Sequence, residues 1–121
     1  MTTAEIASRY HDLANQSKWE HILDELHADE AFCREPEHVA DRGIPVLTEG
    51  KAAIKAKGAA NRTKIDTIHS QFVSEPLVAG NFFTVVLRRD VSFKDGRRLQ
   101  LEEIGLFQVK DGRIVSEEFY Y

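Results

Sequence analysis

The sequence predicts an α+β fold in which three N-terminal helices pack on one face of a curved, mostly antiparallel sheet. Apolar residues recur at helical spacing in the first half of the 121-residue chain. In the second half apolar and polar residues alternate, which is typical of half-buried strands. Two turns of the same sequence, Lys-Asp-Gly-Arg, divide these strands at residues 94–97 and 110–113. A chain of this length forms one domain with a substantial core.

Each helix has a recognisable sequence signal. Residues 2–5 form a capping box, and apolar residues recur from Ile6 at i, i+4 and i+7. A second capping box at residues 17–20 is expected to begin a helix that continues to Leu26. The alanine-rich stretch at residues 51–61 predicts the third helix. One short strand and a loop are expected between the last two helices.

The two Asp-Gly turns determine which residues face inward, because a slip of one residue reverses every side chain of a strand. Asp-Gly permits a two-residue loop or a three-residue loop. Three-residue loops place Phe93 opposite Arg97 and Val109 opposite Arg113, and we choose them because they gather most large apolar residues on one face. That face contains Phe83, Val85, Leu87, Val91, Phe93, Leu99, Leu101, Glu103, Gly105, Phe107, Val109, Val115, Glu117, Phe119 and Tyr121.

Three glutamates, Glu35, Glu103 and Glu117, lie at inward strand positions. A buried carboxylate is costly unless it is protonated, hydrogen-bonded or beside a wet cavity. The pattern therefore predicts an internal pocket with acid–base potential. In the chosen register Glu117 lies opposite Gly105, and Glu103 lies opposite both Leu87 and Phe119. The repulsion and burial of this pair should raise the pKa of at least one carboxyl.

The same register predicts the rest of the pocket lining. Arg89 is the expected inward cation, one diagonal from Glu103. The strand before the turn at Gly80 should place Ile68 and Phe72 inside and His69 and Gln71 outside. The expected ligand-binding residues are Arg89, Phe72, Leu87, Phe107, Phe119 and Tyr121.

Several weak motifs, in this order and at these spacings, resemble the nuclear transport factor 2-like superfamily, which includes ketosteroid isomerases and SnoaL-like polyketide cyclases. The resemblance identifies residues 1–121 as a single SnoaL-like domain. It implies a cone-shaped roll whose open end is a hydrophobic pocket for a small apolar molecule, in a homodimer. The motifs are Arg9-Tyr10, Trp19 with Ile22-Leu23, residues 26–31, residues 49–54 and residues 107–115.

The resemblance to ketosteroid isomerases implies roles for individual residues. Glu35, followed by proline, matches their general base, and Tyr10 matches the tyrosine that donates a hydrogen bond to the developing oxyanion. Gly105 occupies the position of their protonated aspartate, so one oxyanion donor is missing. Such a loss typically costs ~10²–10³ in rate. Glu103 or Glu117 could substitute as a protonated donor.

Two other functions stay open. The first is a non-catalytic ligand-binding or dimerisation module with a filled cone. A cavity of roughly 300 Å³ or more reached by Glu35 and a strand glutamate would favour the enzyme instead. The second is an epoxide hydrolase: Arg88-Arg-Asp90 resembles part of the catalytic arrangement of limonene epoxide hydrolases. There the third acid falls at Phe119, and the chosen register turns Arg88 and Asp90 outward.

Composition and charge exclude several functions. The net charge is −4 without a run of Lys or Arg, which argues against nucleic acid as a partner. The sequence lacks an apolar run of ~20 residues and a signal-peptide pattern, so no membrane is expected. The single cysteine, Cys33, fits a cytoplasmic protein, and without an inward histidine we expect it to be inert. The histidines lack metal-ligand spacing, and we expect neither metal nor cofactor. We expect the homodimer to form through Ile104, Leu106 and Tyr120, on the outer sheet face.

Overall fold

The computed structural model describes all residues 1–121, and it contains three α-helices, one 3₁₀ helix and seven strands. In chain order these elements are α1 (Thr3–Asn15), α2 (Trp19–Leu26), β1 (His27–Arg34), η1 (Glu37–Arg42), β2 (Leu47–Glu49), α3 (Lys51–Thr63), β3 (Ile65–Val73), β4 (Leu77–Ala79), β5 (Phe82–Phe93), β6 (Arg98–Lys110) and β7 (Arg113–Tyr120).

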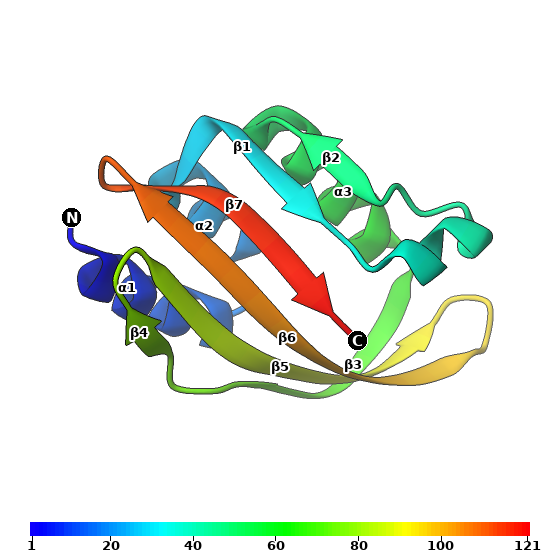
Figure 1. Ribbon diagram of the computed structural model, residues 1–121. Coiled ribbons are helices and arrows are strands. Elements are labelled where there is room, and N and C mark those ends of the chain that lie inside the picture. The colour runs from blue at the N-terminus through cyan, green and yellow to red at the C-terminus, as the bar shows by residue number, and fades with distance from the viewer.

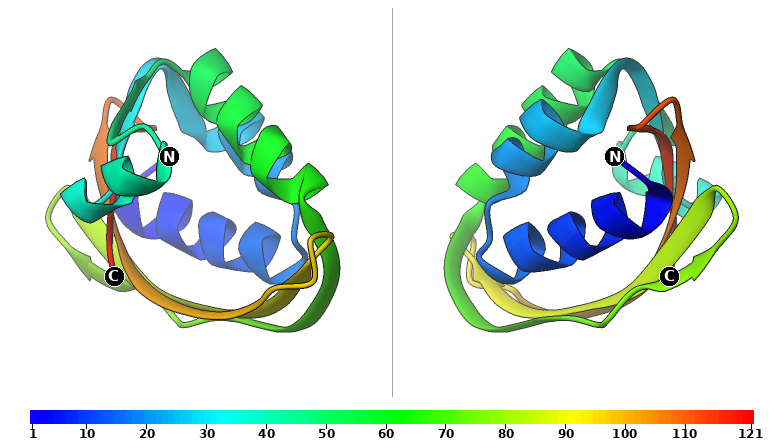
Figure 2. Two further views of the ribbon diagram at one scale, coloured as in Figure 1. Left: turned by 90° about the vertical axis from the view of Figure 1, so that its right-hand side faces the viewer. Right: turned by 90° about the vertical axis from the view of Figure 1, so that its left-hand side faces the viewer.

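All seven strands form one curved sheet in the order β2-β1-β7-β6-β5-β3, with β4 paired to β5. Every strand pair is antiparallel except β1 with β7. The three α-helices cover the concave face, with α1 lying in the trough of the sheet (Figure 2), and no helix covers the convex face (Figure 1). The predicted fold class, helices packed on a curved, mostly antiparallel sheet, is therefore confirmed.

Helix α1 begins as its sequence predicts. The Thr2 hydroxyl accepts a hydrogen bond from the Glu5 amide at 3.1 Å, and the Glu5 carboxylate accepts one from the Thr2 amide at 2.9 Å. The apolar face of the helix supplies the centre of the core, where Tyr10 packs against Phe83 and Phe107, with ring centroids 5.7 and 4.6 Å away. This packing fixes the direction in which Tyr10 points.

The sequence prediction is wrong at the start of α2. Lys18 is the N-cap residue and makes no side-chain cap. Ser17 has a left-handed backbone, with φ of 57°, and its hydroxyl accepts a hydrogen bond from Gln71. Since the tight turn between α1 and α2 uses Ser17, its side chain is not available as a cap. The expected loop after β1 also contains structure, namely η1 and β2.

The two identical turns differ in length. The first has the predicted three-residue loop, in which Phe93 and Arg97 are bonded opposite each other. The second is a two-residue turn, because Asp111 and Gly112 both adopt positive φ and Lys110 pairs with Arg113. A bulge then follows in β7, where Gln108 pairs with Ser116 and Val109 with Ile114. The predicted partners in β7 are therefore wrong by two residues, although Glu117 still faces inward.

This bulge changes the neighbours of the predicted pocket residues. Glu117 lies opposite Phe107 rather than Gly105, and Gly105 lies opposite Phe119. Glu103 lies opposite Leu87 as predicted. The extra residue is Val115, and Ile114 takes the fully buried position at the start of β7.

The inward placement of Phe72 is also wrong. Three residues, 74–76, lie opposite two residues of β5, which reverses the alternation between β4 and β3. Phe72 is therefore 47% exposed on the outer face, with the Arg88 guanidinium over its ring. A second irregularity, between Ile68 and Ser70, restores the alternation, so Ile68 pairs with the buried Val91 on the inward face as predicted, although it is 46% exposed. Gln71 faces inward and donates a hydrogen bond to the carbonyl of Ala14.

The outer sheet face carries exposed apolar side chains. Ile104 and Tyr120 lie opposite each other on β6 and β7 and are about half exposed, and Leu106, two residues along β6, is partly exposed. This is the surface on which a homodimer is expected. None of the three α-helices has the length and hydropathy that crossing a bilayer requires.

Candidate functional site

A cavity of about 200 Å³ lies between the concave face of the sheet and the helices. Glu35, Glu103 and Glu117 all line it, together with Tyr10 from α1 and Arg89 from β5. The structure thus brings the four predicted catalytic residues and the predicted cation around one space. Half of its lining residues are hydrophobic, and they include Trp19, Ile22, Leu23, Ile54, Leu87 and Phe119.

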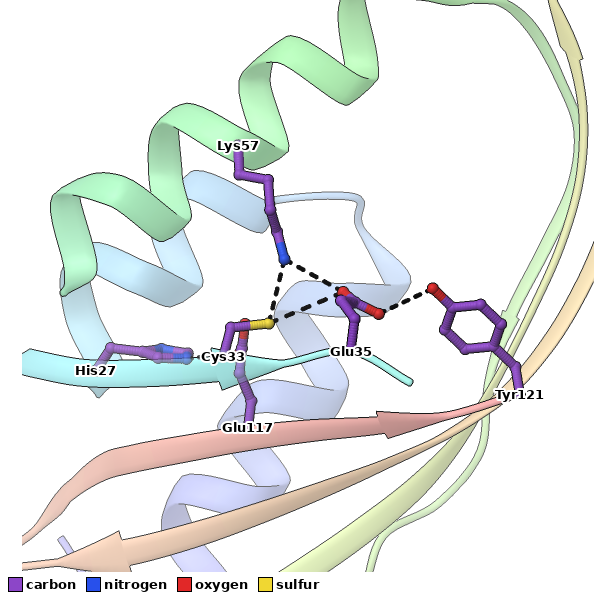
Figure 3. Close-up of polar contacts among 6 residues, drawn as sticks. All are labelled: His27, Cys33, Glu35, Lys57, Glu117 and Tyr121. Atoms are coloured by element: carbon purple, nitrogen blue, oxygen red, sulfur yellow. Dashed lines mark hydrogen bonds and ion pairs between the residues drawn. The ribbon is translucent and has the colours of Figure 1, made fainter. Parts of the chain in front are cut away.

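Glu35 follows β1 directly, and both of its carboxylate oxygens have partners (Figure 3). The Lys57 ammonium on α3 lies 3.2 Å from Oε1, and the Tyr121 hydroxyl donates a hydrogen bond to Oε2 at 2.9 Å. Only 14% of the Glu35 side chain is exposed. Burial, followed by the neighbouring Glu35 charge, raises the pKa of Tyr121, so its hydroxyl stays a donor.

Glu117 is paired with a histidine that the sequence analysis did not place inside. The His27 imidazole is 1% exposed, and its Nε2 lies 2.9 Å from Glu117 Oε2 (Figure 3). The expectation that no histidine faces inward is therefore wrong. The period-two alternation backward from Glu35 through Cys33 and Ala31 includes position 27, so this signal could have identified it. The exposed Asp29 interrupts that alternation.

Glu103 is the carboxylate without a protein partner. Its side chain projects from β6 and makes no hydrogen bond or ion pair with another residue, and Leu87 on the neighbouring strand is apolar. Burial, reinforced by the negative charge of Glu35, raises the pKa of Glu103 to about 7. The sequence predicts a raised pKa for at least one of Glu103 and Glu117, and the structure shows it for Glu103. At neutral pH this carboxyl can donate or accept a proton.

Tyr10 places an unpaired hydroxyl at the cavity. The ring is 3% exposed and is held by Phe83 and Phe107, whereas the hydroxyl makes no hydrogen bond with another residue. Burial, followed by the nearby charges of Glu117 and Glu103, raises the pKa of Tyr10 well above its ordinary value. The hydroxyl therefore remains protonated and can donate to a ligand oxygen.

Arg89 is a partly buried cation without a protein partner. Its Nε is fully buried and makes no hydrogen bond, and no carboxylate forms an ion pair with its guanidinium. Burial lowers the pKa of Arg89, while the charge of Glu103 opposes that change. The group stays charged, as guanidinium groups do in proteins.

Cys33 lies inside the site but is not activated. Its sulfur is 3.4 Å from the Lys57 ammonium and 3.9 Å from Glu35 Oε1 (Figure 3). Burial raises the pKa of the Cys33 thiol strongly, and the charge of Glu117 adds to the effect. A thiol is a poor nucleophile compared with a thiolate. No three His, Cys, Asp or Glu side chains gather as a metal site would require.

The predicted ligand-binding residues fall into three groups. Leu87 and Phe119 line the cavity, as does Arg89. Phe107 is completely buried beneath Tyr10, and Tyr121 reaches the site only through Glu35. Phe72, on the outer face, is excluded. The lining also includes the Lys57 ammonium, which the sequence analysis missed because the helix that carries it reads as a small-residue packing face.

Position 105 leaves no room for another donor. A Cβ on Gly105 would lie 3.0 Å from the Phe107 ring, 3.2 Å from the Phe119 ring and 3.3 Å from Leu87. An aspartate at this position, as in ketosteroid isomerases, would not fit without movement of this packing. The space opposite Gly105, where the sequence analysis placed Glu117, holds Phe119 instead.

The residues that suggested an epoxide hydrolase lie on the outer face. Arg88 forms an ion pair with Glu102 at 3.1 Å, and Asp90 forms one with Arg98 at 2.8 Å. Neither side chain reaches the cavity.

A sequence profile of the SnoaL-like domain family matches residues 1–121. The chain therefore belongs to the SnoaL-like family. No protein of curated function matches its sequence.

Solved structures share the fold over nearly the whole chain. A Mesorhizobium loti protein described as a SnoaL-like polyketide cyclase is 31% identical, with full coverage of both chains and a TM-score of 0.90. TerC, crystallised with polyporic acid, is 20% identical over 98% of this chain and 90% of its own, with a TM-score of 0.77.

A Catenulispora acidiphila protein with a ketosteroid isomerase-like fold, in complex with trimethylamine, is 16% identical over 97% of this chain and 85% of its own, with a TM-score of 0.72. Other matches are described as NTF2-like and cystatin-like.

Proposed function

We propose that this chain binds a small, mostly apolar carbonyl compound and catalyses a cofactor-independent isomerisation or cyclisation by proton transfer. The observation that carries the proposal is the unpaired Glu103 carboxyl, which lines the same cavity as the Glu35 carboxylate and the Tyr10 hydroxyl. A burial-raised pKa near 7 suits a group that must exchange protons at neutral pH.

The proposed reaction begins with proton abstraction from the carbon next to a carbonyl group. Glu35 accepts that proton, and the electron pair moves to the carbonyl oxygen as an enolate. Protonated Glu103 and the Tyr10 hydroxyl donate hydrogen bonds to this oxygen as charge develops. In an isomerisation a conjugated enolate takes the proton back from Glu35 at another carbon. In a cyclisation the enolate carbon attacks a second carbonyl carbon to close a ring, and Glu35 returns its proton to the resulting alkoxide oxygen. Lys57 and Tyr121 are positioning residues that hold Glu35.

The relatives support a carbonyl-containing ligand without identifying it. The Mesorhizobium loti protein is described as a polyketide cyclase, and TerC was crystallised with polyporic acid. A cavity of about 200 Å³ is smaller than the roughly 300–1,000 Å³ of drug-sized ligand sites. We therefore propose a ligand smaller than a steroid.

Deuterium exchange tests the reaction class without knowledge of the natural substrate. The protein is incubated in D₂O with a panel of small ketones, and NMR follows the loss of the α-protons. Glu35→Gln should slow exchange by about 100-fold or more while ligand affinity changes by a few-fold, because the shape is kept and the base is removed. Glu102→Gln, a neighbour of Glu103 on the outer face, is the matched control and should exchange normally. Normal exchange by Glu35→Gln would contradict the assignment of the base.

A non-catalytic binding module is the second candidate. Two of the three carboxylates have partners, since Glu35 is held by Lys57 and Tyr121 and Glu117 is held by His27. The cavity also falls below the volume of roughly 300 Å³ that favours an enzyme. Thermal stabilisation by ketones without any proton exchange would favour this candidate.

We also propose that the protein is a homodimer through the outer sheet face. Ile104 and Tyr120 expose about half of their surfaces there, on adjacent strands. Apolar patches on a sheet face commonly mark a protein interface.

A further inference from the structure

We propose that the ligand of this cavity carries a carboxylate or an equivalent anionic oxygen pair, which binds to the guanidinium of Arg89. The inference rests on the proposed small-molecule site and names the class of its ligand, an organic acid of small size. Two observations support it: Arg89 has no partner within the protein, and other hydrogen-bond donors line the cavity beside it.

Arg89 differs from the other arginines near the cavity in having no partner. Five arginines lie on β5, β6 and β7 or beside the cavity, and four of them have partners within the protein. Arg88 pairs with Glu102, Arg98 with Asp90 and Arg62 with Glu20, and Arg113 donates a hydrogen bond to the carbonyl of Glu25. Arg89 alone has none, although it is the more buried neighbour of Arg88. A buried charge is expensive unless it is paired. The protein therefore retains at Arg89 an uncompensated cation that points into the cavity.

The geometry of the Arg89 guanidinium favours a partner with two oxygens. A guanidinium group presents several N–H donors in one plane, which matches two oxygens of a carboxylate better than a single carbonyl oxygen. Asn61 and Arg62, at the end of α3, line the same cavity and add donors. Arg62 also contributes to the positive potential at Arg89. Donors and positive charge on two elements thus converge where a ligand anion would bind.

The acids that line the cavity would repel an anionic ligand if all of them carried an uncompensated charge. The charge of Glu35 is compensated by the Lys57 ammonium, and Glu117 is hydrogen-bonded to His27. Glu103 is neutral when protonated, and it can then donate a hydrogen bond to the bound ligand. The charged or titratable groups facing Glu103 are Glu35, Cys33 and His27 from the β1 region, Glu117 on β7, Arg89 on β5, Lys57 and Arg62 on α3, and Tyr10 on α1.

This arrangement links anion binding to the protonation of Glu103. Above pH about 7 the Glu103 carboxyl loses its proton, and its charge then repels the ligand. The dissociation constant of an anionic ligand should therefore rise by about tenfold for each pH unit above that value. A neutral ligand of the same shape should show a much smaller change.

The test compares two acids with their amides, benzoate with benzamide and levulinate with levulinamide, by calorimetry on the full chain. We expect at least one acid to bind about tenfold or more tightly than its amide near pH 6. Arg89→Met should remove that preference, Arg89→Lys should keep part of it, and Arg88→Met is the matched control on the opposite face. Glu103→Gln should bind the acid with an affinity that does not change between pH 6 and pH 9, whereas Glu102→Gln should behave like the unaltered protein.

Equal binding of acids and amides, or no binding of either acid, would overturn the inference even if the Arg89 variants failed to fold. A preference for acids that survives in folded Arg89→Met would overturn it as well. Proton exchange with neutral ketones and no preference for acids would contradict this inference alone. An Arg89-dependent preference without any proton exchange would instead contradict the catalytic part of the proposed function.

Discussion

The imidazole of His27, at the start of β1, lies 2.9 Å from the carboxylate of Glu117, near the end of β7. Both side chains are buried, and they join the only parallel pair of strands in the sheet. Both residues line the cavity, so the hydrogen bond between them stabilises the wall that β1 and β7 form.

Removal of either partner should destabilise the protein. Glu117→Gln weakens the hydrogen bond, and His27→Ala leaves the Glu117 carboxylate buried without its donor. We expect a loss of about 1–3 kcal/mol in the free energy of unfolding for His27→Ala, measured by urea denaturation. Glu118→Gln changes the adjacent carboxylate, whose hydrogen bond to Tyr120 is exposed, and should cost less than about 0.5 kcal/mol. Equal effects at the two sites would contradict the buried pairing.

The raised pKa of Glu103 makes stability depend on pH in a defined direction. The folded protein holds this proton more tightly than the unfolded chain, whose value is near 4.5, so the contribution is fully present below pH 4.5. It is lost as the pH rises toward about 7, and the loss amounts to about 3 kcal/mol.

Glu103→Gln should remove this loss, so the variant should gain stability relative to the unaltered protein between pH 4.5 and pH 8. Chemical denaturation at several pH values measures the difference, and NMR titration of the carboxyl locates the pKa directly. Glu102→Gln is the exposed control. An identical pH dependence in the Glu103 variant and the unaltered protein would show that Glu103 is not the group responsible.

Gly105 is expected to resist substitution. Gly105→Ala places a Cβ 3.0 Å from the Phe107 ring, and such overpacking typically costs about 1–3 kcal/mol. The cost should fall in a Phe107→Leu background, where the nearest ring atom is gone. Thermal unfolding of the two single variants and the double variant measures this coupling. Additive effects would indicate that Phe107 is not the obstacle.

Cys33 should react slowly in the native protein. The thiol is 1% exposed and burial raises its pKa, so little thiolate forms at pH 8. A disulfide reagent such as Ellman's reagent should modify native Cys33 on the order of a hundredfold more slowly than the unfolded chain. A rate close to that of the unfolded chain would contradict the buried placement of the sulfur.

The outer face provides a test of assembly. Ile104→Lys places a charge in the centre of the proposed interface, where it should be tolerated by the monomer and excluded from a dimer. Sedimentation should show a dimer for the unaltered protein at micromolar concentration and a species of 13.8 kDa for the variant. A monomer in both cases would contradict the proposed homodimer.

The sequence predicted the fold class because hydrophobic periodicity dominates each element, and it predicted the inward direction of Glu103 because alternation is regular along β6. Glu117 faces inward as predicted because the shorter turn and the bulge in β7 together shift its partner by two residues, which leaves the facing unchanged. The sequence did not predict the register of β7 correctly. The two Lys-Asp-Gly-Arg turns have the same residues but different lengths, so local sequence does not determine the loop. The choice depends on how Ile114 packs against the core after the turn.

Phe72 shows a second limit. Its inward placement was predicted by continuing the in–out alternation of side chains from β4 back through residues 74–76. The strand is interrupted there, and these three residues lie opposite only two residues of β5. Nothing in the period-two pattern marks such an interruption except Pro76. His27 and Lys57 were missed for another reason, since their roles depend on partners that lie 90 and 22 residues away in the chain.

The parallel pairing of β1 with β7 also has a consequence for synthesis on the ribosome. His27 emerges 90 residues before Glu117, so β1 has no neighbour on that side until residues 113–120 have been translated. Contacts this distant in sequence slow folding. A nascent chain in which residues 113–120 are still inside the ribosome therefore leaves the β7 edge of β1 unpaired and exposed. We expect chaperones to bind the protein during that interval.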